Sequence, residues 1–307
     1  MTQTLPNLGL GAETDPPYDT AESPEWVDAA DGPVGDRPIV SVVIPYYNPG
    51  GRLRSTVEHV VRVLDASGIS FEIITVSDGS TDGSPCSLEG LPESAVRRVA
   101  YATNVGKGHA LRTGLALCRG DYVGFIDADG DISPEFLTSF VVAMQVEEPD
   151  MVVGSKRHPG SSVHWTPLRR LYSWGHQTLI RRLFSLDVKD TQVGIKLMRR
   201  RVVTDVLPML RESRFALDLE LLVLAQRLGH THIIEAPVEI EERSGSTISV
   251  HRAWRLLADT VGIFVRLSVR HQYDAAIDFQ VGRRVGAASD ALGESTRTAA
   301  APSPIPA

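Results

Sequence analysis

Continuous apolar runs alternate with helical spacings along the middle of the chain. The runs are rich in Val and Ile, which is typical of strands buried on both faces of a parallel sheet. They span residues 39–44, 71–76, 96–101 and 122–126, with a shorter one at 151–153. The segments with helical spacing span residues 52–66, 106–118 and 134–146. This alternation predicts an α/β fold with a doubly wound, mainly parallel sheet and flanking helices.

The second half of the chain has a different character, because it is basic and amphipathic. Residues 157–201 contain ten Lys or Arg and two acids. Within 168–184 and again within 251–271, apolar residues share one helical face, accompanied by Trp and arginines. Helices of this kind suit the headgroup region of a membrane, although core-packed helices with a solvated basic face have the same pattern. Nucleic acid is not expected as a partner, because the aromatic residues lie among Leu and Ile rather than in a stacking platform.

Composition narrows the class of protein. The formal net charge of −7 is unevenly distributed, since residues 1–36 hold eight acids and no Lys or Arg. Cys86 and Cys118 offer neither a disulfide framework nor metal-ligand spacing. The leader lacks the basic and apolar regions of a signal peptide, and no apolar run reaches the roughly 20 residues that span a bilayer. We therefore expect a cytoplasmic protein, attached peripherally to the inner face of the membrane.

Three carboxylates, Asp127, Asp129 and Asp131, follow the strand predicted at 122–126 at alternate positions. Ligands bind at the carboxyl edge of open α/β sheets, and Mg²⁺ and Mn²⁺ prefer carboxylate oxygens shared with a substrate's phosphates. The pattern therefore suits a metal–diphosphate site, but an acidic turn that caps the next helix would look the same. The polar loops 45–48 and 78–82 should lie on the same edge, which favours a nucleotide site.

Seven short motifs, in order from about 39 to 270, resemble an inverting family 2 glycosyltransferase of the GT-A fold. Four of them stand in the first half: Pro45-Tyr46-Tyr47-Asn48, Asp78-Gly79-Ser80-Thr81-Asp82, Asn104-Val105-Gly106-Lys107 and Asp127-Ala128-Asp129. Three more are similar to the branch that transfers hexoses to dolichyl or polyprenyl phosphate: Gly154-Ser155-Lys156, Asp190-Thr191-Gln192-Val193-Gly194-Ile195-Lys196 and Phe215-Ala216-Leu217-Asp218-Leu219-Glu220.

For the donor, the resemblance implies a nucleotide sugar, with UDP-glucose favoured, and a Mg²⁺ or Mn²⁺ cofactor. Catalytic roles would fall on Asp127, Asp129 and Asp131, of which Asp129 and Asp131 would hold the metal. The nucleotide sugar would contact Pro45, Tyr47, Asp78 and Asp127. Lys107, at a helix start, could face phosphate or be an exposed lysine.

For the acceptor, the resemblance implies polyprenyl phosphate. Lys156, Arg169 and Ser173 would bind its phosphate, and Arg169 and Ser173 are four apart on one helical face. The sugar or an acceptor loop would involve Asp190, Gln192, Asp218 and Glu220, of which Asp218 and Glu220 point to different helix faces. A phosphate monoester, with a second pKa of about 6, is already nucleophilic at neutral pH and needs no strong general base.

These implications divide the chain into regions and define the predicted function. The regions are a disordered acidic leader (1–37), a GT-A domain (38–250) with a nucleotide-binding part (38–154) and an acceptor part (155–250), a membrane-surface amphipathic helix (251–278) and a disordered tail (279–307). The predicted reaction transfers a hexose, glucose first, to polyprenyl phosphate with inversion. Two alternatives remain, a soluble glycosyltransferase with a small phosphorylated or hydroxyl acceptor and a non-catalytic nucleotide-sugar-binding protein.

The sequence also departs from the family pattern in two places, where Pro49 and Ser77 replace acids of many relatives. Both changes remove a carboxylate near the nucleotide, so the base is left open, as are the sugar, the lipid length and the oligomeric state.

Overall fold

A computed structural model describes residues 37–161, 167–240 and 250–283, and of residues 167–172 and 250–253 it describes the backbone alone. The predicted disordered leader lies outside the described residues except for Arg37, as does the tail beyond residue 283. The predicted division of the chain into nucleotide-binding, acceptor and membrane-surface regions stays a prediction.

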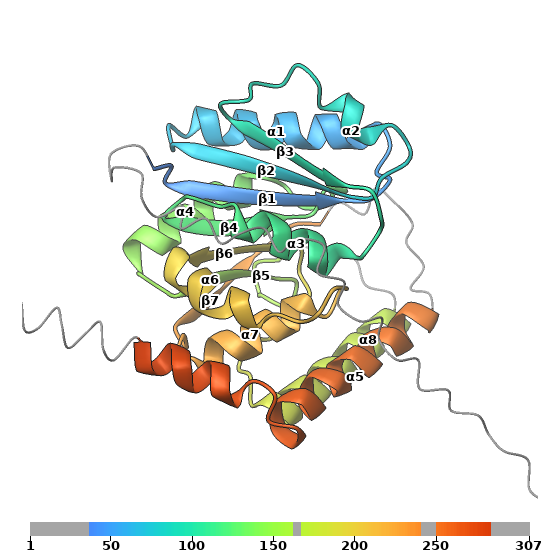
Figure 1. Cartoon of the computed structure of the whole chain (residues 1–307), viewed down its shortest axis with the longest axis vertical. Helices are drawn as coiled ribbons and strands as arrows, with labels where there is room; N and C mark the ends of the chain where they lie inside the picture. The colour runs from blue at the N-terminus through green and yellow to red at the C-terminus, as the bar shows by residue number, and fades with distance from the viewer. Residues whose placement is uncertain (1–36, 162–166, 241–249, 284–307) are drawn as a thin grey trace, which may run out of the picture.

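The centre of the fold is a seven-stranded sheet in the order β3-β2-β1-β4-β6-β5-β7 (Figure 1). The strands are β1 (Val40–Tyr46), β2 (Phe71–Asp78), β3 (Val96–Tyr101), β4 (Tyr122–Ile126), β5 (Met151–Ser155), β6 (Ile195–Arg199) and β7 (Ile233–Pro237). Only β6 is antiparallel to its neighbours, β4 and β5. The predicted α/β class with a mainly parallel sheet is confirmed.

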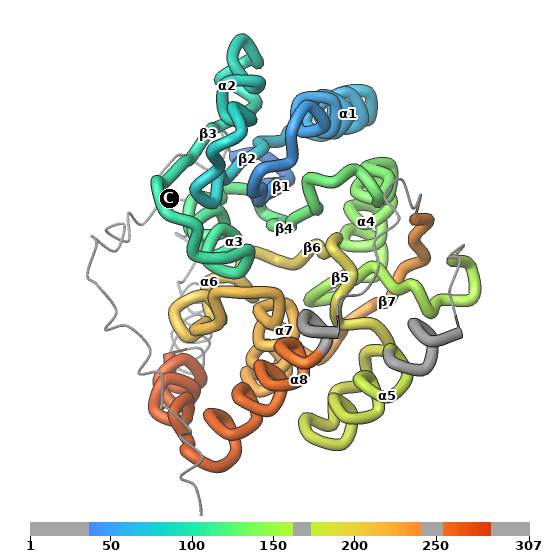
Figure 2. Tube along the Cα trace, turned by 90° about the vertical axis from the view of Figure 1, so that its right-hand side faces the viewer, coloured from blue at the N-terminus to red at the C-terminus, as the bar shows by residue number. Residues whose placement is uncertain are grey.

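Helices cover both faces of this sheet. They are α1 (Arg52–Ala66), α2 (Ser84–Ser87), α3 (Lys107–Ala116), α4 (Glu135–Val146), α6 (Arg200–Val206), η3 (Leu207–Met209) and α7 (Leu217–Arg227). α1 and α4 pack on one face, and α3, α6 and α7 pack on the other (Figure 2). Each face has its own apolar cluster, which explains why the central strands are apolar at consecutive positions.

The basic segments form two long helices, α5 (Pro167–Phe184) and α8 (Val250–Phe264), which lie side by side beyond the sheet (Figure 1). The Phe184 and Phe264 rings meet edge to face at 6.0 Å. A wider helical turn, η4 (Val265–Val269), continues α8. No helix within the described ranges combines the length and apolar content needed to cross a bilayer.

Each of these two helices combines a packed face with an exposed one. Ile180 of α5 and Ile263 of α8 are buried in the apolar core. Trp174 and Trp254, in contrast, are 60% and 69% exposed. The core-packing interpretation therefore accounts for one face of each helix. It does not account for the exposed tryptophans, which take no part in the core.

Two predicted boundaries differ from the structure. β1 runs through Pro45 to Tyr46, two residues beyond the run predicted at 39–44. Its pairing with β4 ends at Val43, so at Pro45 the strand has a ladder neighbour on only one side and tolerates the missing N–H. A last helix at 274–283 also passes the predicted start of the tail at 279, because Gln280 is buried against the domain.

The register of the sheet brings separate loops to one edge. Phe125 of β4 and Val153 of β5 both pair with Lys196 of β6, which runs antiparallel between them. β4 and β5 therefore run in the same direction at the same level, and the loops that follow them emerge together. The two strands lie two spacings apart, about 10 Å. The carboxyl ends of β1 and β2 lie at the same edge.

Candidate functional site

The three carboxylates after β4 crowd together at this edge. The Asp127 N–H donates to the Gly194 carbonyl at 2.9 Å, and the Asp131 N–H donates to Asp129 Oδ1 at 3.1 Å. Burial raises the pKa of Asp129, and the negative charges of Asp127 and Asp131 raise it further. The alternate positions after the strand thus place the carboxylates in one another's field, where a cation would stabilise them.

The carboxylates fit a metal shared with a substrate. Within the described ranges, no group of three or more His, Cys, Asp or Glu side chains is arranged to hold a metal ion alone. Mg²⁺ is commonly bound through one or two carboxylates together with substrate phosphates and water. Asp129 and Asp131 offer that donor set.

Gly194 packs directly against Asp127. A Cβ at position 194 would overlap the Asp127 carboxylate, so any larger residue would displace it. The sequence motif contains this glycine, but its role was not predicted, because the contact joins two strands far apart in the chain.

Lys107 points into the carboxylates from the first residue of α3. Its Nζ lies 2.5 Å from Asp127 Oδ1. Burial by itself would lower the pKa of Lys107, but Asp127 and then Asp218 outweigh burial and raise it. Of the two sequence interpretations, an exposed helix-start lysine is therefore wrong, and the contact of Lys107 with a phosphate stays a prediction.

A second lysine, Lys196, shares the neighbour Asp218 with Lys107. It is fully buried on β6, with its Nζ 2.6 Å from Asp218 Oδ1 and 2.8 Å from the Val193 carbonyl. The ammonium also stands 5.2 Å from the centre of the Phe125 ring. Lys196 had no predicted role, although a lysine within an apolar strand is itself a signal of a buried charge pair.

Asp218 and Glu220 separate as the helix geometry predicted, and the structure shows which one faces the site. Glu220 accepts hydrogen bonds from the backbone N–H groups of Arg211 and Glu212, at 2.9 and 2.8 Å, and from the Tyr273 hydroxyl at 2.5 Å. It therefore orders a loop and ties it to the C-terminal segment. Asp218 is the residue on the side of the two lysines.

The loops after β1 and β2 are joined by hydrogen bonds. Asn48 has a positive φ of 46° and accepts from the Thr81 N–H at 2.8 Å, and the Gly50 N–H donates to Asp82 at 2.8 Å. Tyr47 is 52% exposed beside them, while Pro45 is buried within β1. The predicted contacts of Tyr47 and Pro45 with a nucleotide sugar stay predictions.

Asp78 is occupied by donors of its own chain. The Tyr101 hydroxyl and the Val105 N–H donate to Oδ1 at 2.7 and 2.9 Å, and the Asn104 amide and the Gly106 N–H each donate to Oδ2 at 2.9 Å. Asp78 therefore anchors the loop that leads to Lys107. Its predicted contact with a nucleotide stays a prediction.

The predicted acceptor residues are brought together in part. Asp190 accepts from the backbone N–H groups of Lys156 and Gln192, at 3.1 and 3.2 Å, so it positions the loop after β5. Ser173 accepts a hydrogen bond at 2.8 Å from Arg157, which is not among the residues predicted for the acceptor. The Arg169 side chain lies outside the described residues.

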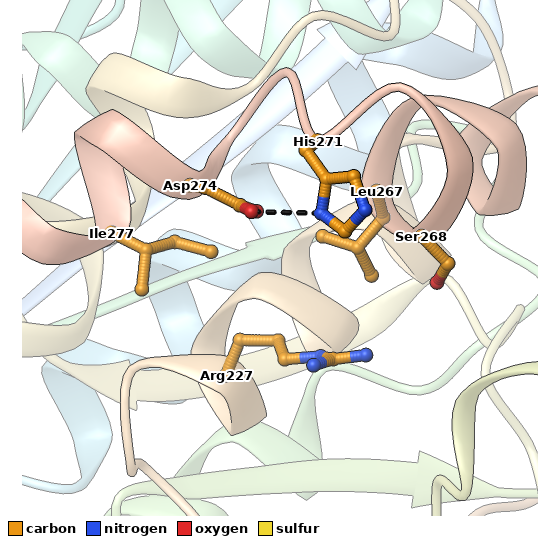
Figure 3. A pocket seen from close by; sticks show the side chains of 6 residues that line it. All are labelled: Arg227, Leu267, Ser268, His271, Asp274 and Ile277. Carbon is orange, nitrogen blue, oxygen red and sulfur yellow. Dashed lines mark hydrogen bonds and ion pairs between the residues drawn. The ribbon is translucent and has the colours of Figure 1, made fainter.

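A separate hollow lies at the far end of α7 from Asp218 (Figure 3). There the His271 Nδ1 lies 2.8 Å from Asp274. The hollow is lined by Arg227, Leu267, Ser268, His271, Asp274 and Ile277. None of these residues belongs to the sheet edge described above.

Comparisons with known proteins identify relatives of the chain. The model of the family described as Glycosyl transferase family 2 matches residues 41–207. Dolichyl-phosphate beta-glucosyltransferase of Dictyostelium discoideum is 32% identical over 228 residues, covering 69% of each protein. The Saccharomyces cerevisiae protein of the same name is 29% identical over 232 residues, again covering 69% of each.

Solved structures of low sequence identity share the fold. Glucosyl-3-phosphoglycerate synthase of Mycobacterium tuberculosis, in complex with Mn²⁺, UDP and glucosyl-3-phosphoglycerate, has a TM-score of 0.58 and 21% identity, covering 78% of this chain and 82% of that one. Mannosyl-3-phosphoglycerate synthase from Rubrobacter xylanophilus has a TM-score of 0.61 and 16% identity, covering 76% and 75%.

Proposed function

Because this chain belongs to glycosyl transferase family 2, we propose that it transfers glucose from UDP-glucose to a polyprenyl phosphate with inversion. The names of the relatives from Dictyostelium discoideum and Saccharomyces cerevisiae support a prenol phosphate acceptor and a glucosyl group. One observation carries the proposal. A carboxylate cluster with the half-buried Lys107 and a basic loop share one edge of the sheet, two strand spacings apart.

The donor would occupy the loops after β1, β2 and β4. Tyr47 and Pro45 would lie against the base, Asp78 would hold the nucleoside, and Asp127 with Lys107 would lie at the diphosphate. Asp129 and Asp131 would hold Mg²⁺ or Mn²⁺. That cation would stabilise the negative charge gained by the leaving nucleoside diphosphate.

The acceptor would approach from the loop after β5 and from α5. An oxygen of its phosphate forms the new bond to the anomeric carbon, while the bond from that carbon to the diphosphate breaks. A phosphate monoester has a second pKa of about 6, so no proton must be removed at neutral pH. Lys156, Arg169 and Ser173 would bind this phosphate. Asp190 and Gln192 would order the loop that presents it.

The exposed tryptophans support a location at the membrane surface. Trp174 and Trp254 project from α5 and α8, and the last turn of α5 carries exposed arginines at 181 and 182. Amphipathic rings and cations suit the headgroup region, where a polyprenyl phosphate presents its polar end. We therefore propose peripheral attachment to the cytoplasmic face.

The test is transfer from radiolabelled nucleotide sugars to a short-chain prenyl phosphate, followed by extraction into organic solvent. We expect label in the organic phase with UDP-glucose, dependent on the phosphate of the acceptor. Transfer to 3-phosphoglycerate with none to prenyl phosphate would establish a small-acceptor enzyme instead. Binding of UDP-glucose without any transfer would support the non-catalytic alternative.

A further inference from the structure

The 210–216 loop, which connects η3 to α7, packs against the first turn of α3. The backbone on both sides of Lys107 contacts this loop. The His109 N–H donates to the Ser213 carbonyl at 3.1 Å, and a Cβ at Gly106 would overlap the same carbonyl. The start of α3, and with it Lys107, is therefore fitted closely to the backbone of the 210–216 loop.

The 210–216 loop is itself held by charged side chains. Glu220 accepts from the backbone N–H groups of Arg211 and Glu212, at 2.9 and 2.8 Å. The Arg266 guanidinium donates to the Glu212 carboxylate and lies 3.8 Å from Glu220 Oε1. Burial by itself would lower the pKa of Arg266, but Glu212 outweighs burial and raises it, so the guanidinium stays charged.

Tyr273 ties the same group of side chains to the C-terminal segment. Its ring is 1% exposed, and its hydroxyl donates to Glu220 at 2.5 Å and accepts from Arg266 Nε at 3.2 Å. The Arg211 guanidinium lies 5.1 Å from the centre of the Tyr273 ring and donates to Gln272 Oε1 at 3.0 Å. Residues that follow α8 in the chain thus fix the 210–216 loop together with α7.

Arg266 neutralises two neighbouring carboxylates. Burial raises the pKa of Glu212, and the charge of Glu220 adds to this effect. Without the guanidinium the like charges would repel each other, or one carboxyl group would take up a proton and exchange its hydrogen bonds. Either change would move the backbone N–H groups that Glu220 holds, and so the 210–216 loop.

A shift of the 210–216 loop would reach the candidate site through Lys107. The Gly106 N–H donates to Asp78 at 2.9 Å, so the chain before Lys107 is anchored independently of the loop. The Lys107 ammonium lies 2.5 Å from Asp127 Oδ1. Closely packed backbones transmit displacements, and a misplacement of about 1 Å at a reacting centre can cost about a hundred-fold in rate.

We propose that Arg266 and Tyr273 are positioning residues of the transfer reaction, which place the Lys107 ammonium at the sugar diphosphate through the 210–216 loop. The inference rests on the proposed function, because Lys107 is one of the donor contacts assigned there. Arg266 and Tyr273 act on Glu212 and Glu220, and these two carboxylates act on the loop backbone.

The experiment measures UDP affinity by calorimetry with Mg²⁺ present, for Arg266→Met alone and combined with Lys107→Met. We expect Arg266→Met to weaken UDP binding about ten-fold, because a charged hydrogen bond to the diphosphate is misplaced. Lys107→Met should weaken binding about ten- to hundred-fold, because that bond is lost. In the Lys107→Met background Arg266→Met should have no further effect, since no ammonium is left to position. Arg266→Lys, which keeps a cation beside Glu212, should recover part of the affinity.

Arg283→Met is the matched control. Arg283 is also an arginine of the C-terminal segment that pairs with a buried carboxylate, Asp205, at 3.3 Å. Asp205 belongs to α6 and not to the 210–216 loop. The control should therefore bind UDP as the wild type does, even if it lowers the stability of the protein.

The double-variant comparison decides on the inference. Unchanged UDP affinity in Arg266→Met would show that the inference is wrong, and so would a loss that is equally large with and without Lys107. If Arg266→Met fails to fold, Tyr273→Phe takes its place, because it removes only a hydroxyl. It should weaken UDP binding in the wild-type background and leave that of Lys107→Met unchanged, and any other result would overturn the inference.

The transfer assay separates this inference from the proposed function. If the wild type binds UDP but transfers no glucose to prenyl phosphate, the proposed function is wrong, and the UDP affinities still decide on Arg266 and Tyr273. If transfer occurs and Arg266→Met binds UDP as the wild type does, the proposed function stands and the inference is wrong. Absence of UDP binding by the wild type would contradict both.

Discussion

The Lys196 ammonium lies 2.6 Å from the Asp218 carboxylate, and both side chains are buried beneath the candidate site. Asp218 also raises the pKa of Lys107, which itself contacts Asp127. Asp218 is thus engaged inside the protein as the ion-pair partner of Lys196. A nucleophile that is already ionised, such as a phosphate monoester, is consistent with that arrangement.

Replacing Lys196 by Met should destabilise the protein strongly. The change leaves Asp218 buried without its ammonium partner, which typically costs about 3–5 kcal/mol. The double variant Lys196→Met with Asp218→Leu should recover most of that loss, because it removes both charges. Urea unfolding curves measure both effects. A single variant as stable as the wild type would show that the pair contributes little to the fold.

Gly194→Ala should impair transfer by displacing the Asp127 carboxylate. A Cβ at 194 has no room beside that side chain. Gly175→Ala is a matched control, because it lies within α5 with no heavy atom near the added Cβ. The control should be neutral or stabilise the protein by about 0.5–1 kcal/mol, as alanine favours helix. Equal activity of Gly194→Ala and the control would contradict the proposed contact.

Asp129→Asn should abolish transfer while the fold is retained. The substitution removes a charge from the proposed cation site with little change in volume. Burial and neighbouring carboxylates already raise the pKa of Asp129, so its neutral form is tolerated by the fold. Circular dichroism checks the fold, and the transfer assay is run with chelator and with added Mg²⁺ or Mn²⁺. Wild-type activity in excess chelator would remove the metal from the proposal.

Stability should fall in mild acid because of His176. Its folded pKa lies near 4, below the ordinary 6.5, owing to burial and to Arg157 in the loop facing it, while α8 presents the neutral Thr260. As the pH falls, His176 takes up a proton in the unfolded chain before it does so in the folded protein. The stabilising contribution of neutral His176 is therefore complete above pH 6.5 and declines between pH 6.5 and about 4. The expected slope is about 1.4 kcal/mol per pH unit.

His176→Gln gives the comparison for that slope, since an amide does not titrate in this range. Urea unfolding at a series of pH values should show a shallower decline for the variant than for the wild type. Parallel curves would mean that other groups govern the acid limb.

The protein should sediment with anionic vesicles and be released by salt. Basic residues near such a surface contribute about 1 kcal/mol each, and salt screens this attraction. Trp174→Ala combined with Trp254→Ala should weaken binding, because both rings are exposed on the two basic helices. Full binding of the double variant, or no binding of the wild type at low salt, would contradict the proposed membrane face.

Several features could be read from local pattern. The strands at 39–44, 71–76 and 122–126 were predictable because burial on both faces requires continuous apolar residues. The predicted parallel topology also located the loops at the carboxyl ends of the strands. It placed the 127–131 carboxylates and the 45–48 loop at one edge of the sheet. The strands β6 and β7 were not predicted, since both are short and interrupted by charged residues.

The partners of individual side chains depended on the tertiary structure. Sequence spacing placed Asp218 and Glu220 on different helix faces, but only packing against β6 and Tyr273 decided which of them meets the lysines. Asp127 follows β4 and Gly194 precedes β6, and the two residues meet only because β6 inserts antiparallel beside β4.

Local sequence therefore determined the elements and the edge where polar loops gather, because burial and hydrogen-bonding periodicity act over a few residues. The ion pairs Lys107–Asp127 and Lys196–Asp218 and the hydrogen bond from Arg157 to Ser173 join positions that are distant in the chain. Such contacts exist only when the sheet order and the helix docking bring the two backbones within side-chain reach, so the tertiary structure alone decided them.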